Sequence, residues 1–413
     1  MREILFLSHR IPYPPDKGDK IRSYNLLKGL SERYRVHLGT FVDDAADWQH
    51  VADLRRICAE TCILPLDPRW ARARSLLGLL SGRALTMAYY DSRRLGNWVR
   101  DLARSHRLAG AYVYSSCMGP YAADLDLGRG AVRIMDFCDI DSDKWRQYAP
   151  THGYPMKWVF AREARMLARA ESELAAKFDA SLVISEAEAG ILRSIAPRSG
   201  DRVAVLPNGV DAEYFDPGRC YDNPFQSGGR RIVFTGAMDY HANVDAVTWF
   251  ARDVFPTVRR RLPDAVFVIV GSNPTLAVRQ LASLPGVEVT RRVPDVRPYL
   301  AHAAAVVAPL RIARGVQNKV LEALAMARPV IATENALQGI PDAGLAGVIT
   351  PADPGAFADA VITSLEAALA EPRGRAFVLD RFVWKAQASK VAAYFSGSGE
   401  ETIAGAPLAV ARA

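Results

Sequence analysis

The sequence predicts an α/β protein made of two doubly wound Rossmann-like domains that face a central cleft. Short apolar runs rich in β-branched residues recur along the chain, and segments of helical period separate most of them. Uninterrupted apolar strands that alternate with helices are typical of parallel sheets covered on both faces. The length of 413 residues allows two or three domains, and the runs are too numerous for one ordinary sheet.

The expected strands fall into two series, each formed by runs of Val, Ile, Leu, Phe and Tyr that end at turn residues. They are Ile4–Leu7, Val36–Phe41, Ala111–Tyr114, Val132–Phe137, Ser181–Ile184, Val203–Leu206, Ile232–Thr235, Val266–Val270, Val287–Thr290, Ala305–Pro309 and Val330–Thr333. A turn-rich stretch, FDPGRCYDNPFQSGG, separates the series that ends at Leu206 from the series that begins at Ile232.

This break predicts the domain organisation. We expect a first domain over residues 1–200 and a second over 201–375. The segment 376–396 has helical period and follows the completed second series, so we expect one helix that returns to pack on the first domain. The small, Gly- and Ala-rich tail 397–413 is expected to be disordered.

Charge, cysteine content and the lack of long apolar runs exclude several classes of protein. The formal net charge is +7 and the pI is near 9.2, which favours anionic partners such as nucleotides, diphosphates or an acidic membrane surface. Five scattered cysteines without a CxxC pair indicate neither a disulfide framework nor a zinc knuckle. The N-terminal apolar run is too short for a signal peptide, and no run is long enough to span a membrane, so we expect a cytoplasmic protein. No GxGxxG follows the first strand, which disfavours a dinucleotide oxidoreductase.

Three linked motifs in the second half carry a family resemblance: PNGVD at 207–211, FTGAMDYHANVDAVTWF at 234–250 and RIARGVQNKVLEALAMARPVIAT at 311–333. Together they resemble GT-B glycosyltransferases of the large family 4. The opening SHRIPYPPDKGDKIRSYNLL and the segment DFCDIDSDKW at 136–145 are similar to bacterial sugar transferases of exopolysaccharide and PEP-CTERM (exosortase) systems. The resemblance implies a first domain that binds the acceptor and a second that binds a nucleotide sugar.

The motif after the expected strand Ala305–Pro309 suits a diphosphate. A loop with Arg311, Arg314 and Gly315 leads into a helix whose free N–H groups attract anions, and guanidinium groups grip phosphate bidentately. Val316, Val320, Leu321 and Leu324 form the apolar stripe of that helix, and Asn318, Lys319 and Glu322 lie on the opposite arc. We expect Arg311, Arg314 and Lys319 to stabilise the departing diphosphate and Glu322 to bind the ribose. The alternative is a solvated helix face with a Lys319–Glu322 ion pair.

The resemblance adds further donor-site residues. Relatives usually carry a glutamate where this chain has Arg314, so we expect Arg314 to face phosphate rather than the donor sugar. Gly236 ends a strand where a ligand can approach the backbone, with Asp239 in the same turn. For Asn243 a helix cap is the favoured interpretation, and for His241 a loop histidine. Arg292 and Val293 follow a strand where relatives bind the nucleotide base.

In the first domain, PPDKGDKIR joins a strand to a helix. Gly18 and Asp19 are expected as turn and cap, with Lys20 and Arg22 in the first turn. Cations there oppose the helix dipole unless an anion compensates, which hints at a phosphate-bearing ligand. A capped surface helix with solvated Lys and Arg fits equally well. His9, just beyond the first strand, is expected to point toward the cleft and to contact the acceptor together with Gly18, Asp19 and Arg22.

The segment DFCDIDSDKW also fits two interpretations. Asp139 and Asp141 imitate the Asp-x-Asp pair that holds a divalent metal in the other major glycosyltransferase fold. Acceptor binding or loop anchoring by Asp136, Asp139, Lys144 and Trp145 is favoured instead. We therefore expect no metal and no other cofactor, since cationic side chains already suit a diphosphate.

Residues Arg69–Arg83 combine four arginines with Trp70 and a leucine cluster, as in a helix that lies on an anionic membrane surface. The alternative is a stripe that packs on its own domain. Peripheral contact with the inner face of the cytoplasmic membrane would suit a lipid-linked acceptor.

These residues predict a retaining, metal-independent glycosyltransferase that moves a sugar from a nucleotide diphosphate sugar to a saccharide or lipid-linked saccharide in exopolysaccharide biosynthesis. No nucleic-acid partner is expected. The alternatives are a nucleotide-sugar 2-epimerase of the same fold and a catalytically degenerate GT-B domain that only binds a partner.

Overall fold

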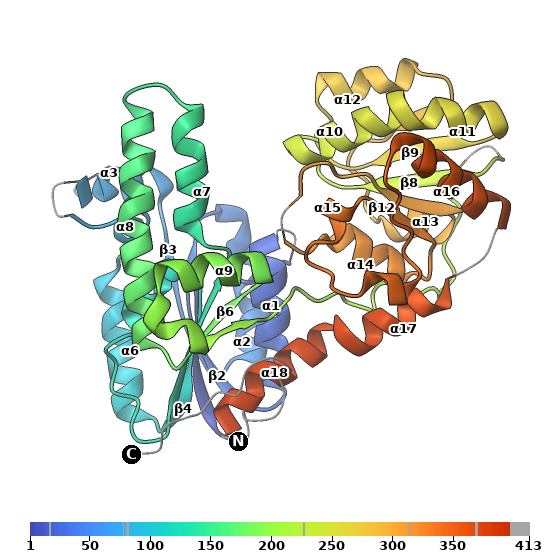
Figure 1. Cartoon of the computed structure of the whole chain (residues 1–413). Coiled ribbons are helices and arrows are strands. Elements are labelled where there is room, and N and C mark those ends of the chain that lie inside the picture. Colours follow the sequence, from blue (N-terminus) through green and yellow to red (C-terminus); the bar gives the residue numbers. More distant parts are fainter. Residues whose placement is uncertain are drawn as a thin grey trace. The chain divides into compact units, whose positions relative to one another are not determined.

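The computed structural model describes residues 1–15, 18–76, 78–79, 82–225, 228–313, 315–367 and 371–396. The chain divides into two compact units, Met1–Leu206 together with the segment that begins at Trp384, and Pro207–Val383 (Figure 1). The expected boundary at residue 200 lies inside the first unit, because β7 (Val203–Val205) still pairs with β6 (Ala180–Val183). The expected tail 397–413 lies outside the described residues.

The first unit contains a parallel sheet of seven strands in the order β3-β2-β1-β4-β5-β6-β7. The remaining bounds are β1 (Glu3–Ser8), β2 (Arg35–Val42), β3 (Glu60–Pro65), β4 (Leu108–Tyr114) and β5 (Val132–Cys138). The edge strand β3 is the one that the apolar runs did not predict. Its buried and exposed residues alternate, because an edge strand has less cover than the continuous buried runs of the centre.

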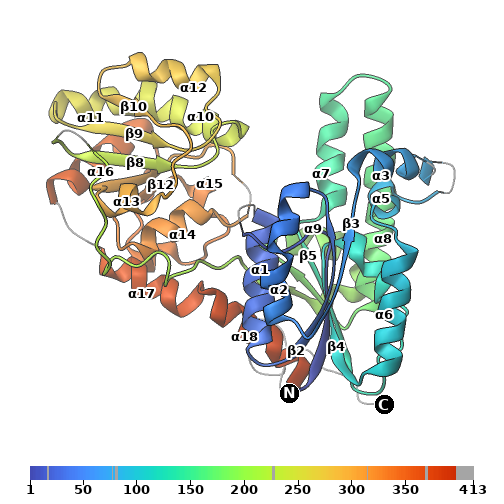
Figure 2. The ribbon, with the colours of Figure 1, turned by 180° about the vertical axis from the view of Figure 1, so that it is seen from behind.

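Successive side chains of each central strand point to opposite faces of this sheet, and each face packs in its own hydrophobic core. Ile4 and Phe6 pack with one set of helices, and Leu5 and Leu7 pack with the other. The helices of the unit are α1 (Gly18–Ser31), α2 (Val51–Ile57), α3 (Pro68–Ser75), α5 (Leu85–Tyr89), α6 (Arg93–Ser105), α7 (Asp141–Tyr148), α8 (Met156–Lys177), α9 (Glu186–Ile195) and α18 (Trp384–Ser396). Figures 1 and 2 show α7 and α8 as a hairpin that extends beyond the carboxyl ends of the strands.

The second unit contains a five-stranded parallel sheet in the order β10-β9-β8-β11-β12. Its strands are β8 (Arg231–Thr235), β9 (Val266–Val270), β10 (Val287–Val289), β11 (Ala305–Ala308) and β12 (Val330–Ala332). Its helices are α10 (His241–Trp249), α11 (Phe255–Arg261), α12 (Leu276–Gln280), α13 (Arg297–Ala301), α14 (Asn318–Ala325), α15 (Glu334–Leu337), α16 (Pro354–Ala367) and α17 (Pro372–Arg381). Each sheet is therefore a doubly wound parallel sheet, as the sequence predicts.

The single helix expected over 376–396 is wrong, because the segment forms two helices that belong to different units. Helix α17 ends at Arg381, and Val383 forms a parallel bridge with Val210 in the second unit. That extended pairing interrupts the helical backbone before α18 begins at Trp384. Only α18 packs on the first sheet, where Trp384 and Val391 join the core beside α1.

No helix in the part of the chain that the structure describes combines the length and the apolar character needed to cross a membrane.

Candidate functional site

In each sheet the strand order reverses at one point, and in open parallel sheets ligands bind beyond the carboxyl ends of the strands there. The reversal lies between β1 and β4 in the first sheet and between β8 and β11 in the second. His9 directly follows β1, Gly236 directly follows β8, and Arg311 follows β11. The sequence therefore places its candidate residues at the two edges where binding is expected.

Lys319, Asn243 and Gly236 form a connected group at the carboxyl edge of the second sheet. Lys319 Nζ donates to Asn243 Oδ1 at 2.7 Å, and Asn243 Nδ2 donates to the Ala237 carbonyl at 2.9 Å. A Cβ at Gly236 would lie only 2.7 Å from Asn243 Nδ2, so the glycine is required for this approach. Asn243 is buried and does not cap α10, which corrects the favoured cap interpretation: its amide holds the ammonium group beside the end of β8.

The amino end of α14 lies in the same region. The helix begins at Asn318, two residues later than the expected start at Val316, because Gly315 has a left-handed φ of 62° and Gln317 is extended. The expected apolar stripe is confirmed for Val320, Leu321 and Leu324, which are buried. Val316 is buried too, but it precedes the helix. The first backbone N–H groups of a helix lack intrahelical partners, so this end can receive an anion.

Burial perturbs the two ionisable groups of this helix end in opposite directions. Desolvation lowers the pKa of Lys319 to about 8, although the charge of Glu322 opposes it. Desolvation raises the pKa of Glu322 to about 7, although the charge of Lys319 opposes it. Lys319 hydrogen-bonds to Asn243 and lies 4.8 Å from the Phe234 ring centroid, which differs from the solvated Lys319–Glu322 pair that was the alternative. Perturbed groups that lie together are typical of functional sites.

Arg311 differs from the expectation that its guanidinium is available for a diphosphate. Its Nε donates to Asp245 Oδ2 at 3.0 Å and its Nη2 donates to Asp245 Oδ1, so a carboxylate on α10 already occupies the guanidinium fork. Asn335 Nδ2 donates to the Arg311 carbonyl at 2.8 Å and fixes the same loop. Arg314 lies outside the described residues.

The other predicted donor residues lie around this edge without joining the connected group. Asp239 is exposed and accepts from Asn273 Nδ2 at 3.2 Å. Arg292 is exposed beyond β10, and Val293 is half-buried against the core of the second unit. Asn318 is half-buried, and its Oδ1 has no hydrogen-bond partner among the described residues.

At the first sheet, the structure brings His9 and Asp19 together. His9 Nε2 lies 3.5 Å from Asp19 Oδ2, and Arg10 Nη1 donates to the same oxygen at 3.1 Å. Burial by itself raises the pKa of Asp19, but the hydrogen bonds and charges of His9 and Arg10 outweigh it, so the pKa is lowered. Helix α1 begins at Gly18, so Gly18 and Asp19 lie in its first turn and not before it as the expected turn and cap. His9 also stacks on Tyr114, with ring centroids 5.7 Å apart.

The expected acceptor contacts of Arg22 and Asp136 are wrong. Both side chains are fully buried, and Arg22 donates to Asp136 through Nε at 2.8 Å and Nη2 at 3.1 Å. Lys20 is also buried and donates to Asp47 at 2.7 Å. The anions that compensate these cations are thus carboxylates of the same domain rather than a ligand, and the alternative of a solvated Lys and Arg is wrong as well.

Asp139 and Asp141 lie where β5 leads into α7. Part of the Asp139 side chain is exposed, but the protein packed around its carboxylate raises its pKa by desolvation, and the charge of Asp141 adds to this rise. Desolvation also raises the pKa of Asp141, with Lys144 and His9 opposing it. The backbone between them is anchored by Glu188, which accepts from the Ile140 N–H at 2.7 Å. In the described residues, no cluster of three metal-ligating side chains includes either aspartate.

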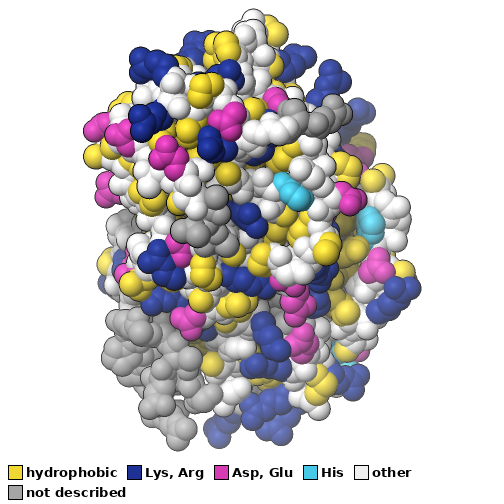
Figure 3. Space-filling view, turned by 90° about the vertical axis from the view of Figure 1, so that its right-hand side faces the viewer, with side chains coloured by type: hydrophobic (Ala, Val, Ile, Leu, Met, Phe, Trp, Pro, Cys, Tyr) yellow, Lys and Arg dark blue, Asp and Glu magenta, His cyan; other side chains and the backbone are white. Residues whose placement is uncertain are grey.

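On the face that Figure 3 shows, Lys and Arg side chains are interspersed with Asp and Glu and do not form one continuous basic patch.

Residues 229–367 match the family described as glycosyl transferases group 1. The chain is 29% identical over 283 residues to a GDP-mannose-dependent α-(1-6)-phosphatidylinositol monomannoside mannosyltransferase of Mycolicibacterium smegmatis, which covers 62% of this chain and 71% of that protein.

The fold is similar to that of solved glycosyltransferases. Sucrose-phosphate synthase of Thermosynechococcus elongatus has a TM-score of 0.62 at 15% identity, covering 96% of this chain and 99% of that one. Anabaena HepE in complex with UDP has a TM-score of 0.63 at 14% identity, covering 96% of this chain and 100% of that one. These likenesses support the GT-B fold.

Proposed function

Because residues 229–367 match the glycosyl transferases group 1 family and the fold is GT-B, we propose that the chain is a retaining, metal-independent glycosyltransferase of exopolysaccharide biosynthesis. The donor is a nucleotide diphosphate sugar, and the acceptor is a saccharide carried on a lipid. The observation that carries the proposal is the Lys319 ammonium, held by Asn243 beside the Gly236 backbone and the amino end of α14.

These groups would bind the diphosphate of the donor. Lys319 and the α14 N–H groups present positive charge where the leaving group gains negative charge, and preorganised cations stabilise such a transition state. Arg314 is proposed to add to this charge, whereas Arg311 is committed to Asp245. Glu322 is proposed to bind the ribose, and Arg292 and Val293 to lie beside the base.

For the transfer we propose front-face attack, which retains the anomeric configuration. The acceptor oxygen bonds to C1 while the bond from C1 to the phosphate oxygen breaks. The acceptor proton passes to the departing phosphate oxygen. No protein base is needed in this step, and His9, Asp19 and Asp139 would position the acceptor.

The experiment that tests this function is turnover with a panel of nucleotide sugars, with and without a lipid-linked saccharide acceptor. The panel includes GDP-mannose and UDP-glucose, because the mycobacterial relative is named as GDP-mannose-dependent and one HepE structure is a complex with UDP-glucose. Nucleotide release that requires the acceptor and survives excess EDTA supports the proposal. Nucleotide release with a 2-epimer and no acceptor would show an epimerase, and binding without turnover would show a degenerate module. Loss of activity in EDTA with rescue by Mn²⁺, abolished in Asp139→Asn, would overturn the metal-independent assignment.

Donor affinity should fall as the pH rises through about 8. A bound diphosphate favours charged Lys319, whose pKa in the free protein is lowered to about 8 by desolvation. Above that pH the charged fraction falls up to about tenfold per pH unit, and below it the affinity should be flat with respect to this group. Calorimetry with UDP and GDP would measure the slope. In Lys319→Arg the side chain stays charged, so the fall in affinity with rising pH should vanish. Titration of the nucleotide itself affects both proteins equally. Equal slopes in the two proteins would contradict the assignment.

The lipid-linked acceptor is supported by exposed aromatic and basic side chains on the first unit. On α3, Trp70 is 76% exposed, and Arg69, Arg72 and Arg74 are exposed as well. Leu76, directly after this helix, is 58% exposed. Tyr154, in the turn between α7 and α8, is 80% exposed, and Trp158, in the first turn of α8, is 48% exposed. Figures 1 and 2 show α3 beside this hairpin. Aromatic rings among basic side chains suit an anionic membrane surface.

We therefore expect the protein to co-sediment with phosphatidylcholine vesicles that contain phosphatidylglycerol, and to dissociate as salt rises. Replacing Arg69, Arg72 and Arg74 together with Gln should weaken binding by about 3 kcal/mol, since each basic residue contributes about 1 kcal/mol near such a surface. The matched control replaces three exposed arginines of the second unit, Arg260, Arg261 and Arg279, and should bind as the wild type does. Equal loss in both triple variants would indicate only non-specific attraction.

A further inference from the structure

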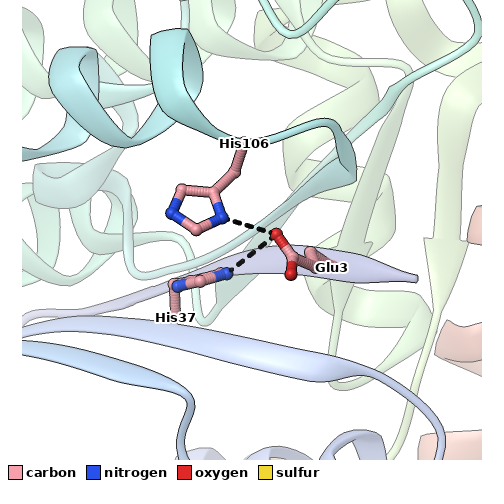
Figure 4. Close-up of side chains that lie close together, drawn as sticks. All are labelled: Glu3, His37 and His106. Atoms are coloured by element: carbon pink, nitrogen blue, oxygen red, sulfur yellow. Dashed lines mark hydrogen bonds and ion pairs between the residues drawn. The ribbon is translucent and has the colours of Figure 1, made fainter. Parts of the chain in front are cut away.

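Four residues far apart in the sequence meet at the amino edge of the first sheet, opposite the edge that holds His9 and Asp19. Glu3 begins β1, His37 lies in β2, Glu60 begins β3, and His106 lies between α6 and β4. These strands are neighbours in the sheet, and the Cα atoms of His37 and Glu60 are register partners. Figure 4 shows the side chains of Glu3, His37 and His106 pointing toward one another.

The three side chains are close enough to share one ion. Glu3 Oε2 lies 2.7 Å from His106 Nδ1 and 3.4 Å from His37 Nε2. One potential ligand atom from each of the three residues lies within 4.8 Å of the others. Bonds of about 2.0–2.2 Å in a tetrahedral zinc site place ligand atoms about 3.3 Å apart, so small side-chain shifts bring these atoms to such a geometry.

His37 gives an independent indication of a ligand. Its side chain has no exposed surface, and neither ring nitrogen has a hydrogen-bond partner among the described residues. Glu3 at 3.4 Å from Nε2 and Glu60 at 3.9 Å from Nδ1 are within ion-pair distance, but neither contact has the geometry of a hydrogen bond. A buried polar group without a partner is costly, and a metal bound to Nε2 would remove that cost.

The surroundings orient the other two side chains. His106 Nε2 lies 3.1 Å from Glu60 Oε1, and a proton shared there turns Nδ1 toward Glu3 and His37. A carboxylate behind a metal-binding histidine is the usual outer partner that fixes the ring and its tautomer. Arg35 Nε lies 3.5 Å from Glu3 Oε1, which leaves Oε2 directed to the two histidines.

We propose that Glu3 Oε2, His37 Nε2 and His106 Nδ1 bind a zinc ion, with a water as the fourth ligand and Glu60 as the outer partner of His106. Imidazole and carboxylate ligands in this number suit Zn²⁺. The ion can enter from solvent, because Glu3 and His106 line a hollow of about 720 Å³. Arg2 and Arg107 line the same hollow, so the ion must be held by direct coordination rather than by a surrounding negative field. The ion would join β1, β2 and the start of β4 at the edge of the sheet opposite His9 and Asp19.

The test uses the full chain after treatment with a chelator. Titration with Zn²⁺ against a competing chromophoric chelator should show one tight site, and the melting temperature should rise with zinc. His106→Gln should weaken the tight site by at least 100-fold, and Glu60→Gln by about 10- to 100-fold, the usual loss for an outer partner. The matched control is His152→Gln, an exposed histidine in the α7–α8 turn, which should bind zinc as the wild type does.

Two results would overturn the proposal. One is a wild-type protein without a tight site. The other is His106→Gln with unchanged zinc affinity, which would place the ion elsewhere. If His106→Gln does not fold, the absorption spectrum of bound Co²⁺ is compared between the wild type and Glu3→Gln. A tetrahedral spectrum in the wild type that is lost in Glu3→Gln supports the site. A spectrum that is the same in both proteins excludes it.

Discussion

Replacing Lys319 with alanine should weaken binding of UDP or GDP by about 1.5–3 kcal/mol, or roughly 10- to 150-fold, because a charge-assisted hydrogen bond to the diphosphate is lost. The ammonium group is already placed by Asn243 at 2.7 Å, so little of its binding energy is spent on ordering it. Transfer should fall at least as much, since the charge of the leaving group grows in the transition state. Arg314→Ala is expected to weaken binding within the same range.

The control for Lys319→Ala is Arg260→Ala, which removes an exposed basic residue of α11 in the same domain. Calorimetry should show wild-type affinity for that control, and the unfolding transition of Lys319→Ala should stay close to the wild type. Asn243→Ala offers a further check, because it should lower affinity without removing the charge. If Lys319→Ala and the control bind the nucleotides equally well, Lys319 does not contact the diphosphate.

The sequence could predict where the chain's strands end because apolar runs mark buried parallel strands, and binding sites of such sheets lie at their carboxyl ends. Gly236 and His9 were found in this way, each directly after a strand. The edge strand Glu60–Pro65 escaped because its burial alternates. The break between α17 and α18 escaped because it depends on pairing of Val383 with Val210, which the local helical period does not contain.

The sequence could not predict which residues form ion pairs with the charged side chains, because these pairs depend on how distant segments pack and not on local spacing. Arg22 meets Asp136, which lies 114 positions away, only because α1 packs on the sheet at the end of β5. Arg311, in the loop after β11, meets Asp245, which lies on α10 of the second unit. From the sequence alone, each of these cations is equally consistent with a bound phosphate, and only the carboxylates supplied by the fold decide against it.

Replacing Asp136 with asparagine should lower the free energy of unfolding by about 3–5 kcal/mol, the loss expected when one partner of a buried ion pair is removed. Asp136 accepts two hydrogen bonds from Arg22, at 2.8 Å and 3.1 Å. It also accepts one from the Cys138 N–H at 3.1 Å and one from the Tyr112 hydroxyl. Asparagine has one acceptor oxygen and no charge, so the guanidinium would remain buried without compensation. Urea unfolding of the full chain, followed by circular dichroism, would measure the loss.

Asp201→Asn is the matched control, because Asp201 is an exposed carboxylate of the same unit, and its replacement should change the free energy of unfolding by no more than about 0.5 kcal/mol. Combining Arg22→Met with Asp136→Leu should recover part of the stability, since an apolar pair of similar volume removes the uncompensated charge. A ligand-binding role for Asp136 would give the opposite pattern: Asp136→Asn would unfold like the wild type but require more acceptor for saturation. That outcome would return Arg22 and Asp136 to the acceptor site and would mean that their burial is relieved when the acceptor binds.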